Sequence, residues 1–185
     1  MDPAEDDELM ARGAQGDEKA FGVLVTRWER PVFAFLEIMV GSREEAQDIA
    51  QEAFLRMCRH AKEYRPSGQF RSWLFRIAGN LARSRLRRRR ILPWIRFDPV
   101  VHNCPTPGDG PDGTREKEEE RLAVRRALGR LPDRQRQAVI LRQYEDLSYR
   151  EIAETMQTTV PAVETLLFRA MVALRKELAR SESRT

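Results

Sequence analysis

The chain has 185 residues, room for one large domain or two small ones, and a formal net charge of +4. Its two cysteines cannot build a disulfide framework, which fits a reducing cytoplasm. The N-terminus is acidic and no apolar run approaches about 18 residues, so the sequence argues against a signal peptide and a membrane span.

Residues 17–40 carry apolar side chains at helical spacing and are predicted to form a helix. Pro31 lies in the middle of this run and should break or bend it, because proline removes a backbone hydrogen bond. Gly41 is expected to end the helix. Ser42, with Glu45 three residues later, then indicates a capping box at the start of the next helix.

That next helix, residues 43–62, is predicted to have two contrasting faces. Its inner stripe is apolar and consists of Ala46, Ile49, Ala50, Ala53, Phe54 and Met57. The opposite face presents Asp48, Gln51, Glu52 and Leu55. A leucine among outward polar side chains favours a docking face for a basic protein surface. The simpler alternative is a solvated acidic face with one stray leucine.

The stretch Phe70–Arg90 holds eight arginines in 21 residues, with no lysine and no acidic residue. Residues 64–69 precede it and are predicted to form a loop, because they contain Pro66 and Gly68. Helical spacing gives this stretch an apolar face of Phe70, Trp73, Leu74, Ile77, Ala78 and Leu81. A different face gathers Arg76, Asn80, Arg83, Arg87 and Arg90.

These eight arginines favour nucleic-acid binding, because uncompensated like charges repel one another unless a polyanion lies over them. The alternative is an ordinary solvated arginine face, although such faces usually mix charge signs. Without the eight charges the chain would carry +4 − 8 = −4, so its remainder is mildly acidic. One basic strip in acidic surroundings predicts a second partner besides DNA.

Residues 91–115 contain five prolines and three glycines with little periodicity, which predicts an extended linker. This linker contains three apolar side chains that are unusual in a free linker, Trp94, Ile95 and Phe97. They could pack back on the first domain or into a partner's groove. We therefore expect an all-α chain of two small helical domains, residues 1–91 and 116–185, joined by a flexible linker over residues 92–115.

The C-terminal part is predicted to contain a helix-turn-helix. Ser148 and Glu151 form a capping box for a short helix, and the tripeptide Gln157–Thr159 separates it from a longer helix that starts near Val160. The longer helix turns Val163, Leu166, Leu167, Ala170 and Leu174 inward. It turns Pro161, Thr165, Phe168, Arg169 and Val172 outward, with Glu164 at the margin. The alternative is a plain helical hairpin.

With two DNA-binding candidates joined by a linker, the chain resembles a bacterial sigma factor of the extracytoplasmic-function (ECF) type. Four motifs in register carry the resemblance: Asp48–Phe54 (DIAQEAF), Phe70–Asn80 (FRSWLFRIAGN) running into arginines, Ala127–Pro132 (ALGRLP), and Leu147–Ala153 (LSYREIA) followed by Val163–Ala170 (VETLLFRA). Together they span nearly the whole length.

The resemblance implies an initiation subunit of RNA polymerase that binds the core enzyme and promoter DNA and is held inactive by an anti-sigma factor. Core binding would use Asp48, Gln51, Glu52 and Leu55. Recognition of the −10 element would use Tyr64, Arg65, Ser67, Gln69, Trp73, Arg76, Asn80, Arg83 and Arg87, with the loop capturing a flipped base. Recognition of the −35 element would use Thr159, Pro161, Glu164, Thr165, Phe168 and Arg169.

Two positions depart from the family pattern. Ser84 stands where many members carry an acidic residue, and Glu164 stands where several carry Lys or Arg. A glutamate cannot bond phosphate, but it can accept a hydrogen bond from a cytosine amine. We therefore expect promoter rules from members with a basic residue at this position not to transfer directly.

The sequence contains no recognisable catalytic constellation, so we expect neither an enzyme nor a small-molecule substrate. The spacings Cys58-x-His60 and His102-x-Cys104 supply too few ligands for a zinc site, and we expect no metal or cofactor. Two other classes remain as alternatives. A stand-alone helix-turn-helix regulator would leave the first domain unexplained, and a small RNA-processing enzyme would need the catalytic residues that are missing.

Overall fold

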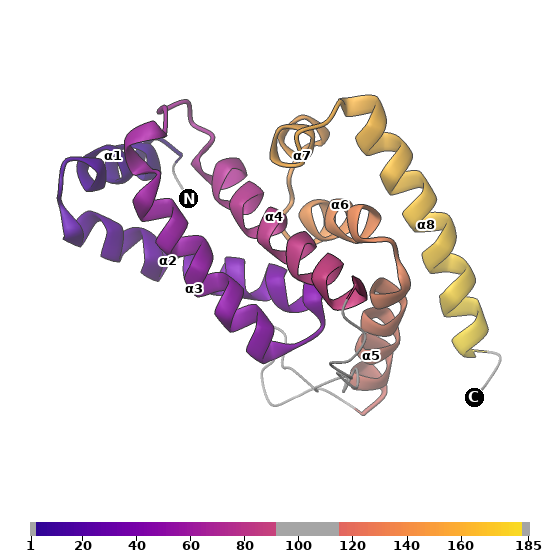
Figure 1. Cartoon of the computed structure of the whole chain (residues 1–185). Helices are drawn as coiled ribbons and strands as arrows, with labels where there is room; N and C mark the ends of the chain where they lie inside the picture. The colour runs from indigo at the N-terminus through magenta and orange to yellow at the C-terminus, as the bar shows by residue number, and fades with distance from the viewer. Residues whose placement is uncertain (1–2, 92–114, 183–185) are drawn as a thin grey trace.

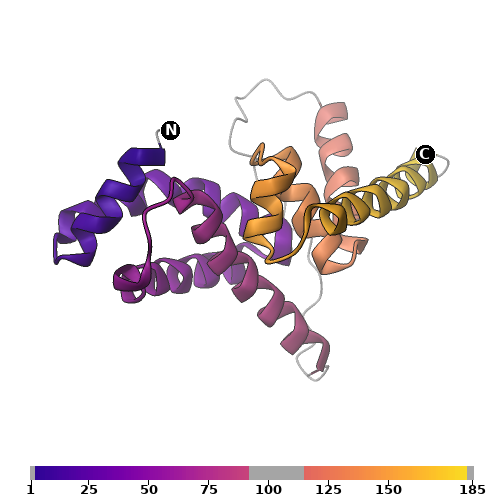
Figure 2. The ribbon, with the colours of Figure 1, turned by 90° about the horizontal axis from the view of Figure 1, so that it is seen from above.

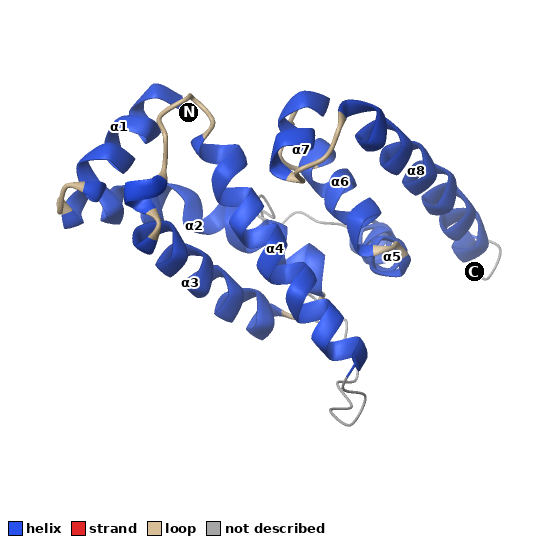
Figure 3. Ribbon diagram, turned by 45° about the horizontal axis from the view of Figure 1, so that its top comes forward, coloured by secondary structure: helices blue, strands red, loops and turns tan. Residues whose placement is uncertain are grey.

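The computed structural model describes residues 3–91 and 115–182 (Figure 1). Over these residues the chain is helical without a strand (Figure 3). The helices are α1 (Pro3–Ala14), α2 (Glu18–Val40), α3 (Arg43–Arg59), α4 (Phe70–Ile91), α5 (Arg115–Arg130), α6 (Asp133–Gln143), α7 (Tyr149–Thr155) and α8 (Val160–Glu182), with a 3₁₀ turn at Ala61–Glu63. The expected all-α class is confirmed. The expected linker, with Trp94, Phe97 and Cys104, lies outside the described residues apart from Arg115.

Helices α1–α4 form one group and α5–α8 a second, with α4 lying between them (Figures 1 and 2). The core of the first group is aromatic: Trp28 and Phe35 of α2 both meet the ring of Phe75 of α4 edge-on, at centroid distances of 6.2 and 5.2 Å. Because such rings are almost fully buried, they contribute much of the apolar area removed from water on folding.

Pro31 does not break α2, which runs from Glu18 to Val40. Of the two predicted effects of Pro31, a break or a bend, the break is therefore wrong. A proline inside a helix costs about 3 kcal/mol, but the helix buries Trp28 and Val32 on either side of it. Continuing the helix keeps both of these side chains in the core, and that burial offsets the lost hydrogen bond. Gly41 ends the helix as expected, with φ +73° and its N–H donating to Glu37 O.

Helix α1 was not predicted, because its sequence is acidic and shows no clear apolar stripe. It is held by tertiary contacts: Met10 is fully buried, and Asp6 accepts hydrogen bonds from Trp28 Nε1 at 3.1 Å and Arg27 at 2.6 Å. The buried Asp6 carboxylate thus has a hydrogen-bond donor at each oxygen, one of them cationic. These bonds fix α1 on α2.

Helix α3 starts as predicted, since Ser42 Oγ accepts the N–H of Glu45 at 3.3 Å. The Glu45 carboxylate turns to Arg89 of α4, at 3.5 Å, rather than completing a capping box. The helix ends at Arg59 instead of Lys62, and the chain continues into the 3₁₀ turn.

The buried face of α4 is rotated from the predicted one. Its buried residues are Phe70, Ser72, Leu74, Phe75, Ala78, Gly79, Ala82 and Leu86, whereas Trp73, Ile77 and Leu81 are only partly buried. The reason is that α4 packs against helices of both groups, so it is buried on more than one side. Its small residues Gly79 and Ala82 lie in these helix contacts. A prediction that assumes one apolar and one polar face does not find them.

The second group contains the expected helix-turn-helix. The Ser148–Glu151 capping box at the start of α7 is confirmed, with both reciprocal hydrogen bonds present. Helix α7 ends in a Schellman arrangement: Gln157 has φ +50° and donates to Glu154 O at 3.2 Å, and Thr158 donates to Ala153 O at 2.9 Å. The two helices pack through the buried side chains of Ile152, Met156, Val163, Leu167 and Ala170. Leu166, predicted to face inward, is partly buried.

Arg136 of α6 joins the two groups through backbone carbonyls. It is 6% exposed and donates to Leu128 O, Gly129 O and Leu131 O at the end of α5, at 2.6–3.1 Å. It also donates to Met39 O near the end of α2 at 2.5 Å. Burial lowers the pKa of this guanidinium, yet four of its five N–H donors reach carbonyl acceptors at two helix C-termini.

Over the described ranges, no helix is long and apolar enough to cross a membrane. Within the same ranges, no group of three or more His, Cys, Asp and Glu side chains could hold a metal ion.

Candidate nucleic-acid interface

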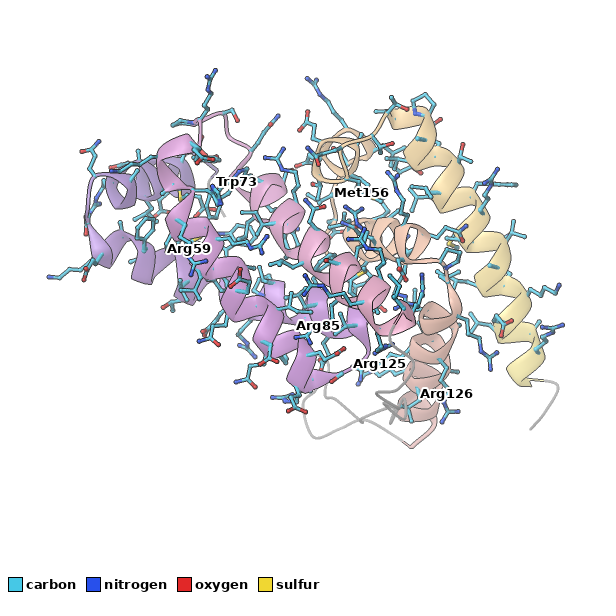
Figure 4. All side chains as sticks on the ribbon, in the orientation of Figure 1. Arg59, Trp73, Arg85, Arg125, Arg126 and Met156 are labelled. Atoms are coloured by element: carbon cyan, nitrogen blue, oxygen red, sulfur yellow. The ribbon has the colours of Figure 1, made fainter. Side chains whose placement is uncertain are left out.

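The predicted docking face of α3 lies on the surface. Asp48 and Gln51 are exposed, Glu52 is partly exposed, and Leu55 is 45% exposed. Glu52 accepts a hydrogen bond from Arg56 at 2.7 Å, which lowers the pKa of its carboxyl. Arg85 of α4, labelled in Figure 4, lies 3.7 Å from Asp48. The face therefore combines acidic side chains with an accessible apolar side chain.

The loop before α4 and the first turns of that helix enclose a pocket of about 250 Å³. Its lining is Glu63, Tyr64, Arg65, Ser67, Gln69, Ser72, Trp73, Arg76 and Glu154. The structure thus brings together six of the nine residues predicted for −10 recognition. Asn80, Arg83 and Arg87 lie further along α4 and do not line it.

Aromatic rings form one wall of this pocket. Tyr64 and Trp73 have ring centroids 5.0 Å apart at an interplanar angle of 57°, and Phe70 stands 6.1 Å from Trp73. Burial, followed by the hydrogen bond to Asp7, raises the pKa of Tyr64, so its hydroxyl stays protonated. Tyr64 and Trp73 are partly exposed, and aromatic rings beside arginines suit an unstacked base and its phosphate.

Three residues of the pocket were missed by the sequence interpretation: Glu63, Ser72 and Glu154. Ser72 lies one helical turn before Arg76, so helical periodicity could have found it. Glu154 belongs to α7, in the second group of helices, and no local pattern connects it with the loop. Figure 4 labels Trp73 on α4 and Met156 directly after the end of α7.

The arginine face of α4 is partly occupied by α6. Arg83 donates to Gln137 Oε1 at 3.0 Å, and Arg90 pairs with Asp133 at 2.8 Å. Arg83 also donates to Asn80 Oδ1. Burial, followed by repulsion from Arg134, lowers the pKa of Arg83. Asn80 and Arg87 are exposed. The face predicted for −10 DNA is therefore present, but the second group of helices lies against it.

The residues predicted for −35 recognition share the exposed side of α8. Pro161, Glu164, Thr165, Phe168 and Arg169 are all exposed, and Phe168 is 72% exposed. Thr159 precedes the helix and accepts the N–H of Ala162 at 3.4 Å. The Thr165 hydroxyl donates to Pro161 O one turn earlier at 2.9 Å. The Thr165 methyl and the Phe168 ring are thus available for apolar contact with a base edge.

Comparison with known proteins accounts for both groups of helices. Residues 24–91 match the family described as Sigma-70 region 2, and residues 121–174 match the family described as Sigma-70, region 4. The RNA polymerase sigma-H factor of Pseudomonas aeruginosa is 31% identical over 185 residues, covering 94% of each chain. The ECF RNA polymerase sigma-E factor of Escherichia coli is 34% identical over 176 residues, covering 91% of this chain and 92% of that one.

Two solved structures match the fold of this chain. CnrH in complex with the cytosolic domain of CnrY matches with a TM-score of 0.72 and 26% identity, over 95% of this chain and 98% of that one. The sigma factor RpoE of Bartonella quintana, in complex with the anti-sigma factor NepR, matches in fold with a TM-score of 0.71, over 87% and 98% of the two chains. The chain therefore belongs to the ECF sigma factors.

Proposed function

We propose that this protein binds core RNA polymerase, directs it to promoters with −35 and −10 elements, and helps to melt the −10 region. The pocket of Tyr64 and Trp73 carries the proposal, because an aromatic wall beside arginines suits a base that has left the duplex. Extruding a base costs a few kcal/mol, which stacking and phosphate contacts would offset. Within the cell, this activity would be cytoplasmic.

The other two surfaces support distinct parts of this activity. The α3 face of Asp48, Gln51, Glu52 and Leu55 would dock on a basic surface of core polymerase through charge complementarity around an apolar contact. Helix α8 would enter the major groove at the −35 element, with Arg169 on phosphate and Glu164 at a base edge.

The contact between α4 and α6 has a consequence for promoter binding. Arg83 and Arg90 are engaged by Gln137 and Asp133, so these two arginines would become available to DNA only after α6 moves away from α4. Two of the structural relatives are complexes with a second protein, and an anti-sigma factor is the corresponding partner that we propose for this chain. Such a partner would hold the protein away from core polymerase.

Reconstitution with purified core polymerase tests the proposal. Core enzyme with the protein is expected to start transcription at cognate promoters and to make thymines of the −10 region reactive to permanganate, whereas core enzyme alone should do neither. The alternative, a stand-alone helix-turn-helix regulator, predicts tight binding of the protein alone to duplex DNA at physiological salt. Such binding, without any stimulation of core polymerase, would overturn the proposal.

A further inference from the structure

Helix α1 carries two adjacent buried carboxylates that serve different neighbours. Asp6 is 2% exposed and holds Arg27 and Trp28 of α2. Asp7 is 8% exposed and points to the loop of residues 64–69, which is about 60 positions away in the sequence. Because successive helical residues point about 100° apart, one short helix can reach both the core and the loop.

Asp7 binds the loop at two points with its two carboxylate oxygens. Oδ1 accepts a hydrogen bond from the Tyr64 hydroxyl, and Oδ2 accepts the backbone N–H of Gly68 at 2.6 Å. Gly68 has φ +70°, a conformation that favours glycine and aims its N–H at the carboxylate. One carboxyl group of α1 therefore accepts a hydrogen bond from each end of the loop.

Tyr64 packs against the rings of Phe70 and Trp73, but the rest of this loop is open to solvent. Arg65, Pro66, Ser67, Gly68 and Gln69 are all exposed, so burial does not fix their positions. Arg65, Ser67 and Gln69 nevertheless line the pocket next to Tyr64 and Trp73. By joining Tyr64 to Gly68, the Asp7 carboxylate ties together two points of the loop that flank Arg65 and Ser67.

We propose that Asp7 is a positioning residue for recognition of the −10 element: it fixes the loop so that the pocket discriminates among unstacked bases. This rests on the proposed function, because it assigns a role within the same pocket. Asp7 itself would not touch DNA. Its effect would pass through Tyr64 and Gly68, since a preorganised pocket loses less free energy on ordering when the base enters.

The test compares Asp7→Ala with Asp6→Ala in full-length protein bound to core polymerase. Binding is measured to single-stranded −10 oligonucleotides in which each position is varied in turn. Asp7→Ala is expected to reduce the preference at one or two positions about tenfold, with unchanged affinity for core. Asp6→Ala removes the neighbouring carboxylate that holds α2, so it should lower the melting temperature and leave the ratio of preferred to disfavoured bases unchanged.

Two more variants make the result specific. Asp7→Asn should restore most of the preference, because an amide can donate to the Tyr64 oxygen and accept from the Gly68 N–H. Tyr64→Phe keeps the ring and removes only the hydroxyl, so it should lose part of the base preference. If Asp7→Ala does not fold, this variant tests the contact between Asp7 and Tyr64 in its place. Amide hydrogen exchange at Gly68 should be faster in Asp7→Ala than in wild type or Asp6→Ala.

The outcomes separate this proposal from the proposed function. A wild-type preference that survives unchanged in both Asp7→Ala and Tyr64→Phe would overturn the role of Asp7 alone. An equal loss of preference in Asp6→Ala would do the same, since it would mean that any loosening of α1 has this effect. If the wild-type holoenzyme showed no base preference at any −10 position, this would contradict the proposed −10 recognition and also the role of Asp7.

Discussion

The side chain of Gln137 fills the space beside Gly79 that any larger residue would need. A Cβ built on Gly79 would lie 2.3 Å from Gln137 Nε2 and 3.1 Å from its Cδ. Both residues are buried, and Gln137 Oε1 accepts a hydrogen bond from Arg83 in the same contact. A glycine on α4 thus permits the close approach of α6 that covers the arginine face.

Gly79→Ala is expected to separate the two groups of helices. Alanine favours a helix over glycine by about 1 kcal/mol, so α4 itself should not weaken. The added methyl group would displace the fully buried Gln137 and its bond to Arg83. Small-angle X-ray scattering should show a larger radius of gyration. Gly22→Ala in α2, where a Cβ meets nothing within 4 Å, is the matched control. An unchanged scattering profile for Gly79→Ala would contradict this account.

The second prediction concerns the pH dependence of stability at Glu145. Burial raises the pKa of its carboxyl to about 6, against an opposing effect of the Arg71 hydrogen bond. Because the folded pKa lies above the unfolded value of 4.5, the folded state binds more protons between these two pH values. This group therefore favours the folded state below pH 4.5, and that advantage is lost as the pH rises through about 6.

Glu145→Gln keeps the shape and a hydrogen-bond acceptor for Arg71 but removes the titration. Relative to this variant, the wild type should lose about 2 kcal/mol of unfolding free energy between pH 4.5 and pH 7. Denaturant unfolding of both proteins across this range measures the difference, and other titrating groups cancel in the comparison. Parallel stability profiles for the two proteins would show that Glu145 does not titrate there.

The third prediction concerns the docking face on α3. Asp48→Lys with Glu52→Lys changes exposed or partly exposed side chains, so the fold should be retained. Binding to core polymerase should fall sharply, because charge attraction would become repulsion. Glu18→Lys with Glu29→Lys makes the same change in net charge at exposed positions of α2 and should bind normally. Wild-type affinity for core in the α3 double variant would remove this assignment.

The fourth prediction concerns α8. Arg169→Ala should weaken binding at the −35 element for all sequences and reduce the salt slope by about one. Glu164→Arg should instead change which −35 sequence is preferred, because a side chain that accepts hydrogen bonds is replaced by one that only donates them. Lys176→Ala, exposed nearer the C-terminal end of α8, is the control for loss of one positive charge. A selection of promoters by holoenzyme that returns the wild-type sequence for Glu164→Arg would refute its role.

Local patterns in the sequence were sufficient to predict the helix-turn-helix, the capping box of α7 and the exposed side of α8. Ser148, Glu151 and the spacing of Val163 and Leu167 act within a few residues of one another. The sequence did not predict α1, because the buried bonds of Asp6 are made to residues about 20 positions away. Its patterns likewise could not show that Pro31 is tolerated, since that depends on how much neighbouring surface is buried.

The candidate site likewise contains residues that the sequence could indicate and residues that it could not. Tyr64, Trp73 and Arg76 could be proposed from one stretch of sequence, because the loop and the helix that carry them are continuous. Glu154 of α7 lines the same pocket and Asp7 of α1 binds the Tyr64 hydroxyl beside it, and only the tertiary structure brings these two residues there. The covering of Arg83 by Gln137 also follows from packing between the two groups of helices, which periodicity along α4 does not encode.

The last prediction concerns Asn80, which is exposed on α4 and accepts a hydrogen bond from Arg83 through its side-chain oxygen. An amide carries a donor and an acceptor and can pair with a base edge in a way that arginine donors alone cannot. If Asn80 reads a base, Asn80→Ala should fold, bind core normally, and lose about 1–3 kcal/mol of discrimination at one −10 position.

Arg83→Ala is the control variant for Asn80→Ala. Phosphates carry no sequence information, so this variant should weaken all promoters nearly alike. It also removes the partner of both Asn80 and Gln137, so loosening of the contact with α6 should accompany it. The measurement is transcription by reconstituted holoenzyme from promoters varied singly across the −10 element. A uniform loss across every promoter for Asn80→Ala would leave Asn80 as a residue that only orients Arg83, because a base-reading amide must distinguish one position from the rest.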